Sequence, residues 1–181
     1  MTQTEPLLSV EHFSLRFGGS DTNLIDDISF SVEPGKTLCL VGESGCGKSV
    51  TSLALMGLLA KGAARVTGGA AVFSGQDLFS LGERSRADLR GNDIAMIFQE
   101  PMTSLNPSMT IGQQIVEGIL RHKSGSKDAA RLRALEMLGL VRIPAPEKRF
   151  HTYPHQLSGG MRQRAMIAMA LANAPRLLIA D

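Results

Sequence analysis

The chain has 181 residues, of which 43% are hydrophobic and 20% charged, and its net charge is +2. This length suits one domain, or one domain with a subdomain, and the composition is that of an ordinary globular protein. So small a net charge does not support nucleic acid as a partner. The polar start predicts no signal peptide, and the longest apolar run, residues 53–60, is too short to cross a bilayer. We therefore expect any connection with a membrane to go through a partner protein.

The beginning of the chain predicts antiparallel strands. Residues 8–17 alternate loosely and precede two glycines, and residues 28–32 alternate strictly before the turn at Pro34 and Gly35. Phe17 stands near the end of the first strand. An aromatic ring there could stack on an adenine base, but its position alone favours a strand-end core residue.

Residues 42–49 read G-x-x-x-x-G-K-S, between an apolar stretch suited to a buried strand, residues 37–41, and a stretch suited to a helix, residues 50–60. In this context the pattern predicts a phosphate-binding loop, because glycines and a helix N-terminus let backbone amides converge on an anion. Lys48 would reach the β- and γ-phosphates, and the Ser49 hydroxyl would join the coordination of Mg²⁺. The residues expected at the triphosphate are Gly42, Glu43, Ser44, Gly45, Cys46, Gly47, Lys48, Ser49 and Val50.

A second buried parallel strand is predicted at residues 93–98, after a short strand within residues 68–75 and a helix within residues 80–90. The strand ends at Gln99. Ligands of open α/β sheets are met at the C-terminal ends of parallel strands. Gln99 therefore fits a Mg²⁺ ligand or a residue that positions water, and it fits a loop glutamine equally well.

Two helices are predicted next. Ile111, Ile115 and Ile119 belong to a one-sided apolar stripe, and Ser126 can cap a second helix that ends near Gly139. Such a stripe is more typical of a core than of a partner surface.

The last part of the chain holds two further candidate sites. Ser158, Gly159 and Gly160 begin an Ala/Met-rich helix and form either a second anion-binding site or an ordinary serine cap with a flexible turn. The presence of a P-loop in the same chain favours the anion-binding site. Residues 177–180 are an apolar strand that ends in Asp181, which is the Walker B pattern of a Mg²⁺-holding carboxylate.

These motifs together resemble an ABC transporter ATPase, and they follow that family's order and spacing from about residue 8 to residue 181. Residues 98–107 and 153–164 are similar to the ATPase subunits of bacterial oligopeptide and dipeptide importers, to which those of nickel and glutathione importers are related. The resemblance implies an α/β fold with a P-loop NTPase core: a parallel sheet, an antiparallel N-terminal β-subdomain and an inserted helical subdomain.

The resemblance also implies a division of the chain. Residues 1–181 would be a single, incomplete ABC ATPase domain that lacks the C-terminal part of its core. Within it, residues 1–101 would form the β-subdomain and the first part of the core. Residues 102–156 would form the helical subdomain, and residues 157–181 the signature helix and the Walker B strand.

For the site, the resemblance implies that ATP and Mg²⁺ are the cofactors. Phe17 becomes the aromatic residue that stacks on adenine, and the catalytic roles fall to Lys48, Gln99 and Asp181. Mg²⁺ would be held through Ser49, Gln99 and Asp181. The signature residues would contact ATP bound by a second subunit; they are Ser158, Gly159 and Gly160.

The partners implied are integral membrane permease subunits, a second ABC ATPase subunit in a homo- or heterodimer, and indirectly an extracytoplasmic substrate-binding protein. No nucleic acid is expected. The implied location is the cytoplasmic face of the bacterial inner membrane. ATP binding and hydrolysis would drive peptide transport there.

The sequence departs from the family's pattern at the end of the chain. The family's general-base glutamate directly follows the Walker B aspartate, and the sequence stops at Asp181. The family's switch histidine is also absent. We therefore expect an N-terminal fragment of an importer ATPase that binds ATP and turns it over very slowly by itself. The alternatives are a non-hydrolysing nucleotide-binding fragment and a soluble ABC-type ATPase that does not serve transport.

Overall fold

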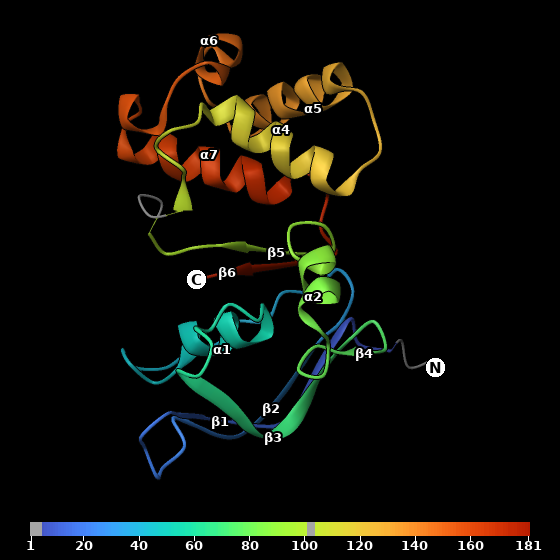
Figure 1. Ribbon diagram of the computed structural model, residues 1–181, viewed down its shortest axis with the longest axis vertical. Helices are drawn as coiled ribbons and strands as arrows, with labels where there is room; N and C mark the ends of the chain where they lie inside the picture. The colour runs from blue at the N-terminus through green and yellow to red at the C-terminus, as the bar shows by residue number, and fades with distance from the viewer. Residues whose placement is uncertain (1–4, 101–103) are drawn as a thin grey trace. The chain divides into compact units, whose positions relative to one another are not determined.

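The computed structural model describes residues 5–100 and 104–181 (Figure 1). The chain falls into two compact units, residues 1–87 and 88–181, and each is described by itself. The predicted subdomain boundaries after residues 101 and 156 are not decided by this division and stay predictions.

The first unit is built on an antiparallel sheet. Its strands follow the order β2-β1-β3-β4 across the sheet, so β1 lies between β2 and β3. Their bounds are β1 Leu8–Phe17, β2 Ile25–Val32, β3 Ala64–Phe73 and β4 Gln76–Asp77. The antiparallel opening predicted from the alternation is therefore confirmed. Phe13 and Leu15 of β1 are fully buried, and the Phe13 ring stacks on Phe79 with centroids 4.9 Å apart.

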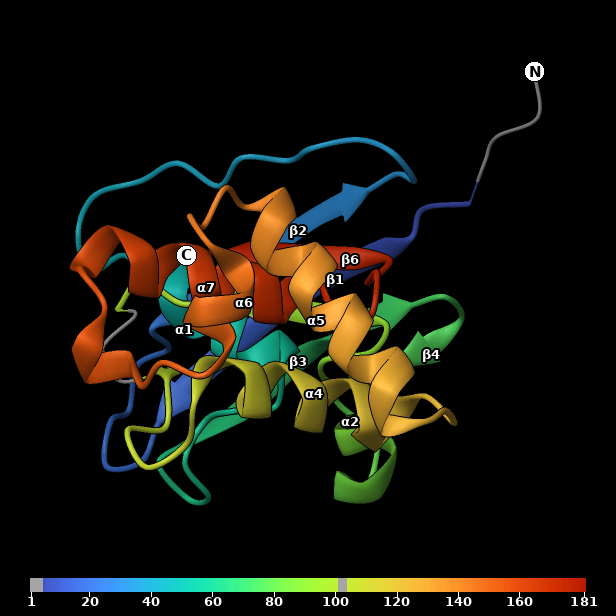
Figure 2. The same cartoon turned by 90° about the horizontal axis from the view of Figure 1, so that it is seen from above.

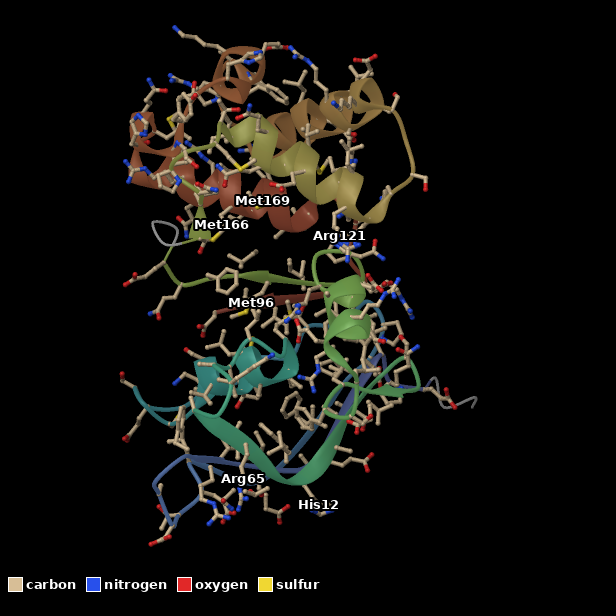
Figure 3. All side chains as sticks on the ribbon, viewed as in Figure 1. His12, Arg65, Met96, Arg121, Met166 and Met169 are labelled. Atoms are coloured by element: carbon tan, nitrogen blue, oxygen red, sulfur yellow. The ribbon has the colours of Figure 1, made fainter. Side chains whose placement is uncertain are left out.

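Strands β1 and β2 are interrupted by bulges. His12 and Asp27 both have a φ of 51°, and His12 Nδ1 lies 2.7 Å from Asp27 Oδ1. Figure 3 shows His12 at the margin of this unit, and its side chain is exposed. On the neighbouring strand β3, Gly69 has a φ of 83°, and a Cβ atom there would overlap the carbonyl groups of Glu11 and His12. The bulge in β1 thus requires a glycine on β3.

Residues 37–41 are not a strand, contrary to the sequence prediction. Leu38 and Leu40 are 42% and 43% exposed, and Val41 is 94% exposed. Their apolar pattern favours burial, but a strand also needs a neighbour that completes its hydrogen-bond ladder. Among the described strands, none pairs with this segment. The helices of this part of the chain are α1, Lys48–Leu55, and α2, Glu83–Leu89.

The second unit holds a parallel pair of strands and a group of helices. β5, Ile94–Ile97, pairs in parallel with β6, Leu177–Ala180, so the buried parallel strand predicted at residues 93–98 is confirmed, whereas β6 is only partly buried. In Figures 1 and 2 the helices α4, α5 and α7 lie together on one side of these strands. The helices are α4 Ile111–His122, α5 Lys127–Leu140, α6 Pro146–Phe150, the 3₁₀ helix η1 Pro154–Gln156, and α7 Gly159–Leu171.

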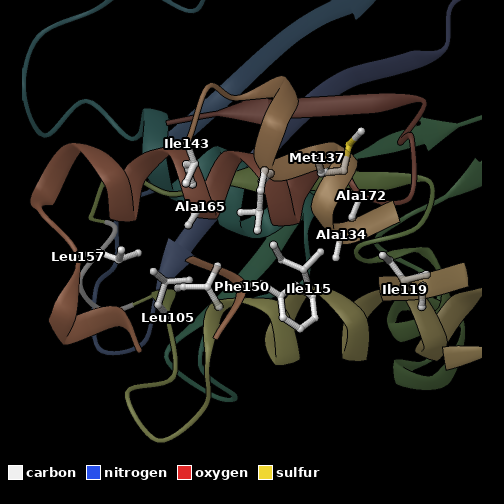
Figure 4. Packing of buried hydrophobic residues seen from close by; sticks show 14 residues of the cluster. Leu105, Ile115, Ile119, Ala134, Met137, Ile143, Phe150, Leu157, Ala165 and Ala172 are labelled. Carbon is white, nitrogen blue, oxygen red and sulfur yellow. The ribbon is translucent and has the colours of Figure 1, made fainter. Parts of the chain in front are cut away.

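A hydrophobic core joins these helices. The predicted stripe of α4 is buried, with Ile111, Ile115 and Ile119 no more than 5% exposed. Ser126 caps α5 as predicted, since its side chain accepts a hydrogen bond from the Ala129 amide at 3.1 Å. Figure 4 shows the cluster around the Phe150 ring; its labelled members are Leu105, Ile115, Ile119, Ala134, Met137, Ile143, Phe150, Leu157, Ala165 and Ala172.

A buried amide ties three elements of this unit together. Asn173, just after α7, is 7% exposed, and its Nδ2 donates to the Gly91 carbonyl at 2.8 Å and the Gly118 carbonyl at 3.1 Å. Gly91 lies before β5, and Gly118 is in α4. Because both partners are acceptors, only the amide nitrogen can face them. Asn173 therefore links the end of the signature helix to α4 and to the start of β5.

The same region carries a surface ion pair. Arg121, labelled at the end of α4 in Figure 3, lies with Nη2 2.9 Å from Asp88 Oδ1. Next to it, burial and the charge of Arg121 lower the pKa of His122 below its ordinary value. Over the described residues, no helix is both long enough and apolar enough to span a membrane.

The first prediction concerns two glycines of α4. A Cβ atom at Gly112 would overlap the Phe150 ring, whereas one at Gly118 would meet no atom within 4 Å. Gly112→Ala should lower the free energy of unfolding by about 1–3 kcal/mol, because the ring must move within a packed core. Gly118→Ala should raise it by about 0.5–1 kcal/mol through helix propensity alone. Urea unfolding of both variants measures the difference, and equal effects would contradict this packing.

The second prediction concerns the buried amide. Asn173→Ala should cost about 1–3 kcal/mol, because the Gly91 and Gly118 carbonyls lose the hydrogen bonds that the buried amide donates to them. Asn173→Asp keeps the shape but turns an acceptor toward two carbonyl oxygens, so it should cost more than alanine does. Urea unfolding again gives both values. An aspartate variant as stable as the original chain would show that shape, not donation, matters at this position.

Candidate functional site

The P-loop is closed by its own lysine. Lys48 Nζ donates to the carbonyl oxygen of Gly42 at 2.8 Å and to that of Glu43 at 2.6 Å. It also lies 3.4 Å from the Cys46 sulfur. The ammonium group is thus held among the backbone acceptors of the loop.

The glycines of the loop have identifiable structural reasons. Gly45 and Gly47 have φ values of 84° and 95°, which side-chain-bearing residues rarely adopt. A Cβ atom at Gly47 would lie 3.1 Å from the Ile25 side chain, and one at Gly42 would lie 2.7 Å from the Cys46 sulfur. Glycine at positions 42 and 47 therefore lets the backbone of the loop approach the Cys46 and Ile25 side chains closely.

The start of α1 is suited to an anion. Gly47 is its N-cap, so no side chain caps the helix, and its first turn contains no acidic residue. Unpaired amides and the positive end of the helix dipole favour phosphate at such a terminus. Ser49 and Val50 lie in this first turn, which places the predicted Mg²⁺ ligand Ser49 beside Lys48.

Phe17 is the last residue of β1 and is 37% exposed. Its ring is therefore not a core residue of the described structure, which is what its position alone had favoured. An exposed aromatic ring at a strand end suits base stacking. The adenine contact itself stays a prediction.

Gln99 and Asp181 both follow the C-terminal end of a strand of the parallel pair. Ile97 of β5 is in register with Ala180 of β6, and the Asp181 amide donates to the Ile97 carbonyl at 3.0 Å. Gln99 follows β5 by two residues, so both side chains stand beyond the C-terminal ends of adjacent parallel strands. This is the edge where α/β sheets bind ligands.

The signature segment forms the start of α7. Ser158 is the N-cap and its side chain accepts a hydrogen bond from the Met161 amide at 3.4 Å. The next two residues, Gly159 and Gly160, are exposed, and a Cβ atom on either would meet nothing within 4 Å. The serine cap is therefore real. The two glycines, however, are not required by the packing of this chain.

Two residues that the sequence analysis left unassigned hold this segment in place. Leu157 is 3% exposed and belongs to the helical core. Arg162 Nε donates to the Pro154 carbonyl at 2.8 Å, which fixes the turn that leads into the signature. No local pattern predicts this role, because the hydrogen bond joins residues eight positions apart.

The described residues fit ATP with Mg²⁺. A lysine ammonium, a glycine-lined backbone and an uncapped helix start are the donors that a triphosphate requires. Among the described residues, no three His, Cys, Asp or Glu side chains gather to hold a metal ion.

The candidate residues belong to both units. Phe17 and the P-loop lie in residues 1–87, whereas Gln99, the signature and Asp181 lie in residues 88–181. Pro101, Met102 and Thr103, part of the importer-like segment 98–107, fall outside the described residues.

Comparison with known proteins identifies the family. A family model described as "ABC transporter" matches residues 25–181. The chain is 52% identical over 177 residues to the probable peptide ABC transporter ATP-binding protein y4tR of Sinorhizobium fredii, which covers 97% of this chain and 53% of that protein. It is 51% identical over 179 residues to the dipeptide transport ATP-binding protein DppD of Bacillus subtilis, with 98% and 53% covered. The chain spans about half the length of these curated relatives.

The solved structures agree with this match. The ATP-binding cassette MJ0796, in a dimeric post-hydrolysis state bound to ADP and Pi, superposes with a TM-score of 0.84 at 25% identity, over 96% of this chain and 73% of that one. The resemblance to ABC ATPases and the α/β fold inferred from the motifs are confirmed. This chain belongs to the ABC transporter family.

Proposed function

We propose that the chain is the ATP-binding, energy-coupling part of a bacterial peptide importer. The observation that carries the proposal is the loop from Gly42 to Ser49, where the Lys48 ammonium stands at the start of an uncapped helix. The peptide branch is supported by the relatives, whose names describe peptide and dipeptide transport ATP-binding proteins.

The chemistry proposed for the site is phosphoryl transfer from ATP to water. Lys48 neutralises charge on the β- and γ-phosphates, and Ser49 and Asp181 hold Mg²⁺. Gln99 completes the metal shell or orients the attacking water. Phe17 stacks on the adenine ring, and the remaining loop residues bind the phosphates through their backbone amides.

The signature would serve a second copy of the site. Gly159 and Gly160 leave open space in front of the first turn of α7, so another subunit's nucleotide can approach the backbone there. The first turn of α7 carries no acidic residue that would repel a phosphate. A head-to-tail pair of ATPase subunits would close on ATP, and MJ0796 is dimeric in its solved structure.

The proposed partners follow from the transport role. Permease subunits in the bacterial inner membrane would receive the motion of the ATPase pair at the cytoplasmic face. An extracytoplasmic binding protein would deliver the peptide. Nucleotide binding would close the pair and hydrolysis would release it, which biases the permease between two states.

The third prediction tests the P-loop. Lys48→Ala should weaken the binding of Mg-ATP by tenfold to a hundredfold, since a charge-assisted hydrogen bond to phosphate is worth about 1.5–3 kcal/mol. Isothermal titration calorimetry measures the change. The control is Lys61→Ala, which removes an exposed lysine of the same unit and should leave the affinity unchanged. Unaltered binding in the Lys48 variant would overturn the assignment of the loop.

The fourth prediction tests whether the signature glycines serve the approach of a nucleotide or the packing of the chain itself. Gly160→Val should change the free energy of unfolding by less than about 1 kcal/mol, because nothing lies within 4 Å of the new Cβ. It should nevertheless reduce ATP turnover in the complete transporter at least tenfold, since the side chain blocks the approach of the partner's nucleotide. Gly139→Val, also at an open helical glycine, is the control and should leave turnover intact. Full turnover in the Gly160 variant would exclude the signature role.

A further inference from the structure

The charge of the chain is unevenly distributed. Residues 1–87 carry 7 lysines and arginines against 9 acidic residues, whereas residues 88–181 carry 12 against 8. Within the second unit, residues 142–164 carry 5 basic residues against a single carboxylate, Glu147, and the rest of the unit carries 7 of each. The basic excess of this unit therefore lies in the segment that contains α6 and leads into the signature.

Part of this segment is assembled with α5 into one cluster. The Arg131 guanidinium of α5 lies over the Phe150 ring, 4.8 Å from its centroid, and its Nη2 is 3.5 Å from His151 Nε2. The His151 ring meets the Phe150 ring edge-on, with centroids 5.1 Å apart. Lys148 and Arg149 occupy the last turn of α6. These four residues, Arg131, Lys148, Arg149 and His151, are called the Arg131 cluster.

The Arg131 cluster has no counter-charge within the described structure. Arg121 pairs with Asp88 and Arg133 with Glu136, and among the described residues no ion pair involves a member of the cluster. Arg149 Nε is buried without a hydrogen-bond partner. The nearest carboxylates in sequence, Asp128 on α5 and Glu147 on α6, form no ion pair with it. The negative end of the α6 helix dipole would explain why Lys148 and Arg149 lie in its last turn. It would not explain Arg131, which belongs to α5.

We propose that the Arg131 cluster binds a carboxylate-rich segment of a partner protein. The stacked Phe150 ring holds the guanidinium in one orientation, and His151 Nε2 fixes it further by accepting from Nη2 at 3.5 Å. The planar fork of N–H groups that the guanidinium keeps free of this contact suits the two oxygens of a carboxylate. A surface for anionic lipid instead uses several flexible lysines, and the cluster has one. This surface is distinct from the nucleotide site and stands whether or not the proposed function holds.

The test is the binding of a fluorescent hexaglutamate peptide to the full chain at low salt, measured by anisotropy. Arg131→Gln combined with Lys148→Gln should weaken binding at least tenfold. The control removes the same charge from two exposed lysines beside the α4–α5 connection, by Lys123→Gln with Lys127→Gln, and should weaken it less than twofold. Equal losses would show unspecific attraction and overturn the proposal.

A second variant guards against misfolding, because Arg131 also contacts the core residue Phe150. His151→Asn leaves that contact in place and should still weaken the peptide at least threefold, with unchanged thermal unfolding. Vesicles of phosphatidylcholine with phosphatidylserine form the other arm. Cluster-dependent binding to the vesicles without binding to hexaglutamate would assign the surface to lipid and refute the proposal.

Discussion

The proposed site depends on one interaction, the contact of the Lys48 ammonium with the carbonyl oxygens of its own loop. The loop has no ladder partner to define it, so this charge and the positive-φ glycines set its shape. A triphosphate would draw hydrogen bonds of the same ammonium toward stronger, charged acceptors. The affinity for the triphosphate then depends on the difference in strength between these two sets of hydrogen bonds. Lys48 thereby couples the geometry of the loop to the binding of phosphate.

The glycines of the chain fall into two kinds, and the distinction carries functional information. Gly69 and Gly112 are required from within, because a Cβ atom would overlap neighbouring atoms of the same unit. Gly159 and Gly160 face open space, and glycine there weakens the helix by about 1 kcal/mol each relative to alanine. Open space alone does not mark a site, because Gly118 of α4 and Gly139 of α5 also face open space. Gly159 and Gly160 differ in lying in the first turn of α7, directly after the Ser158 cap, where our proposal brings another subunit's nucleotide close to the backbone.

Local patterns predicted local structure well. The stripe of α4, the Ser126 cap and the strand before Asp181 depend on residues close in sequence, and all are present. The strand expected at residues 37–41 was wrong because strand formation requires a neighbour, which the pattern of one segment does not contain. Asn173 gave no signal either, since its partners Gly91 and Gly118 lie 82 and 55 residues away. The roles of the site residues rest on two units and a ligand, and remain proposals for that reason.

The net charge is a sum over the whole chain, so it does not show how charge is distributed along the chain. A value of +2 argued against nucleic acid, which needs a basic surface long enough to follow many phosphates. The same value conceals a basic segment beside the signature and a mildly acidic first unit. The Arg131 cluster has four members, of which Arg131 and His151 contact the Phe150 ring, and is too small to follow a nucleic acid backbone. Our proposal assigns it a contact with one or two carboxylates, so the distribution of charge along the chain is more informative than its net value.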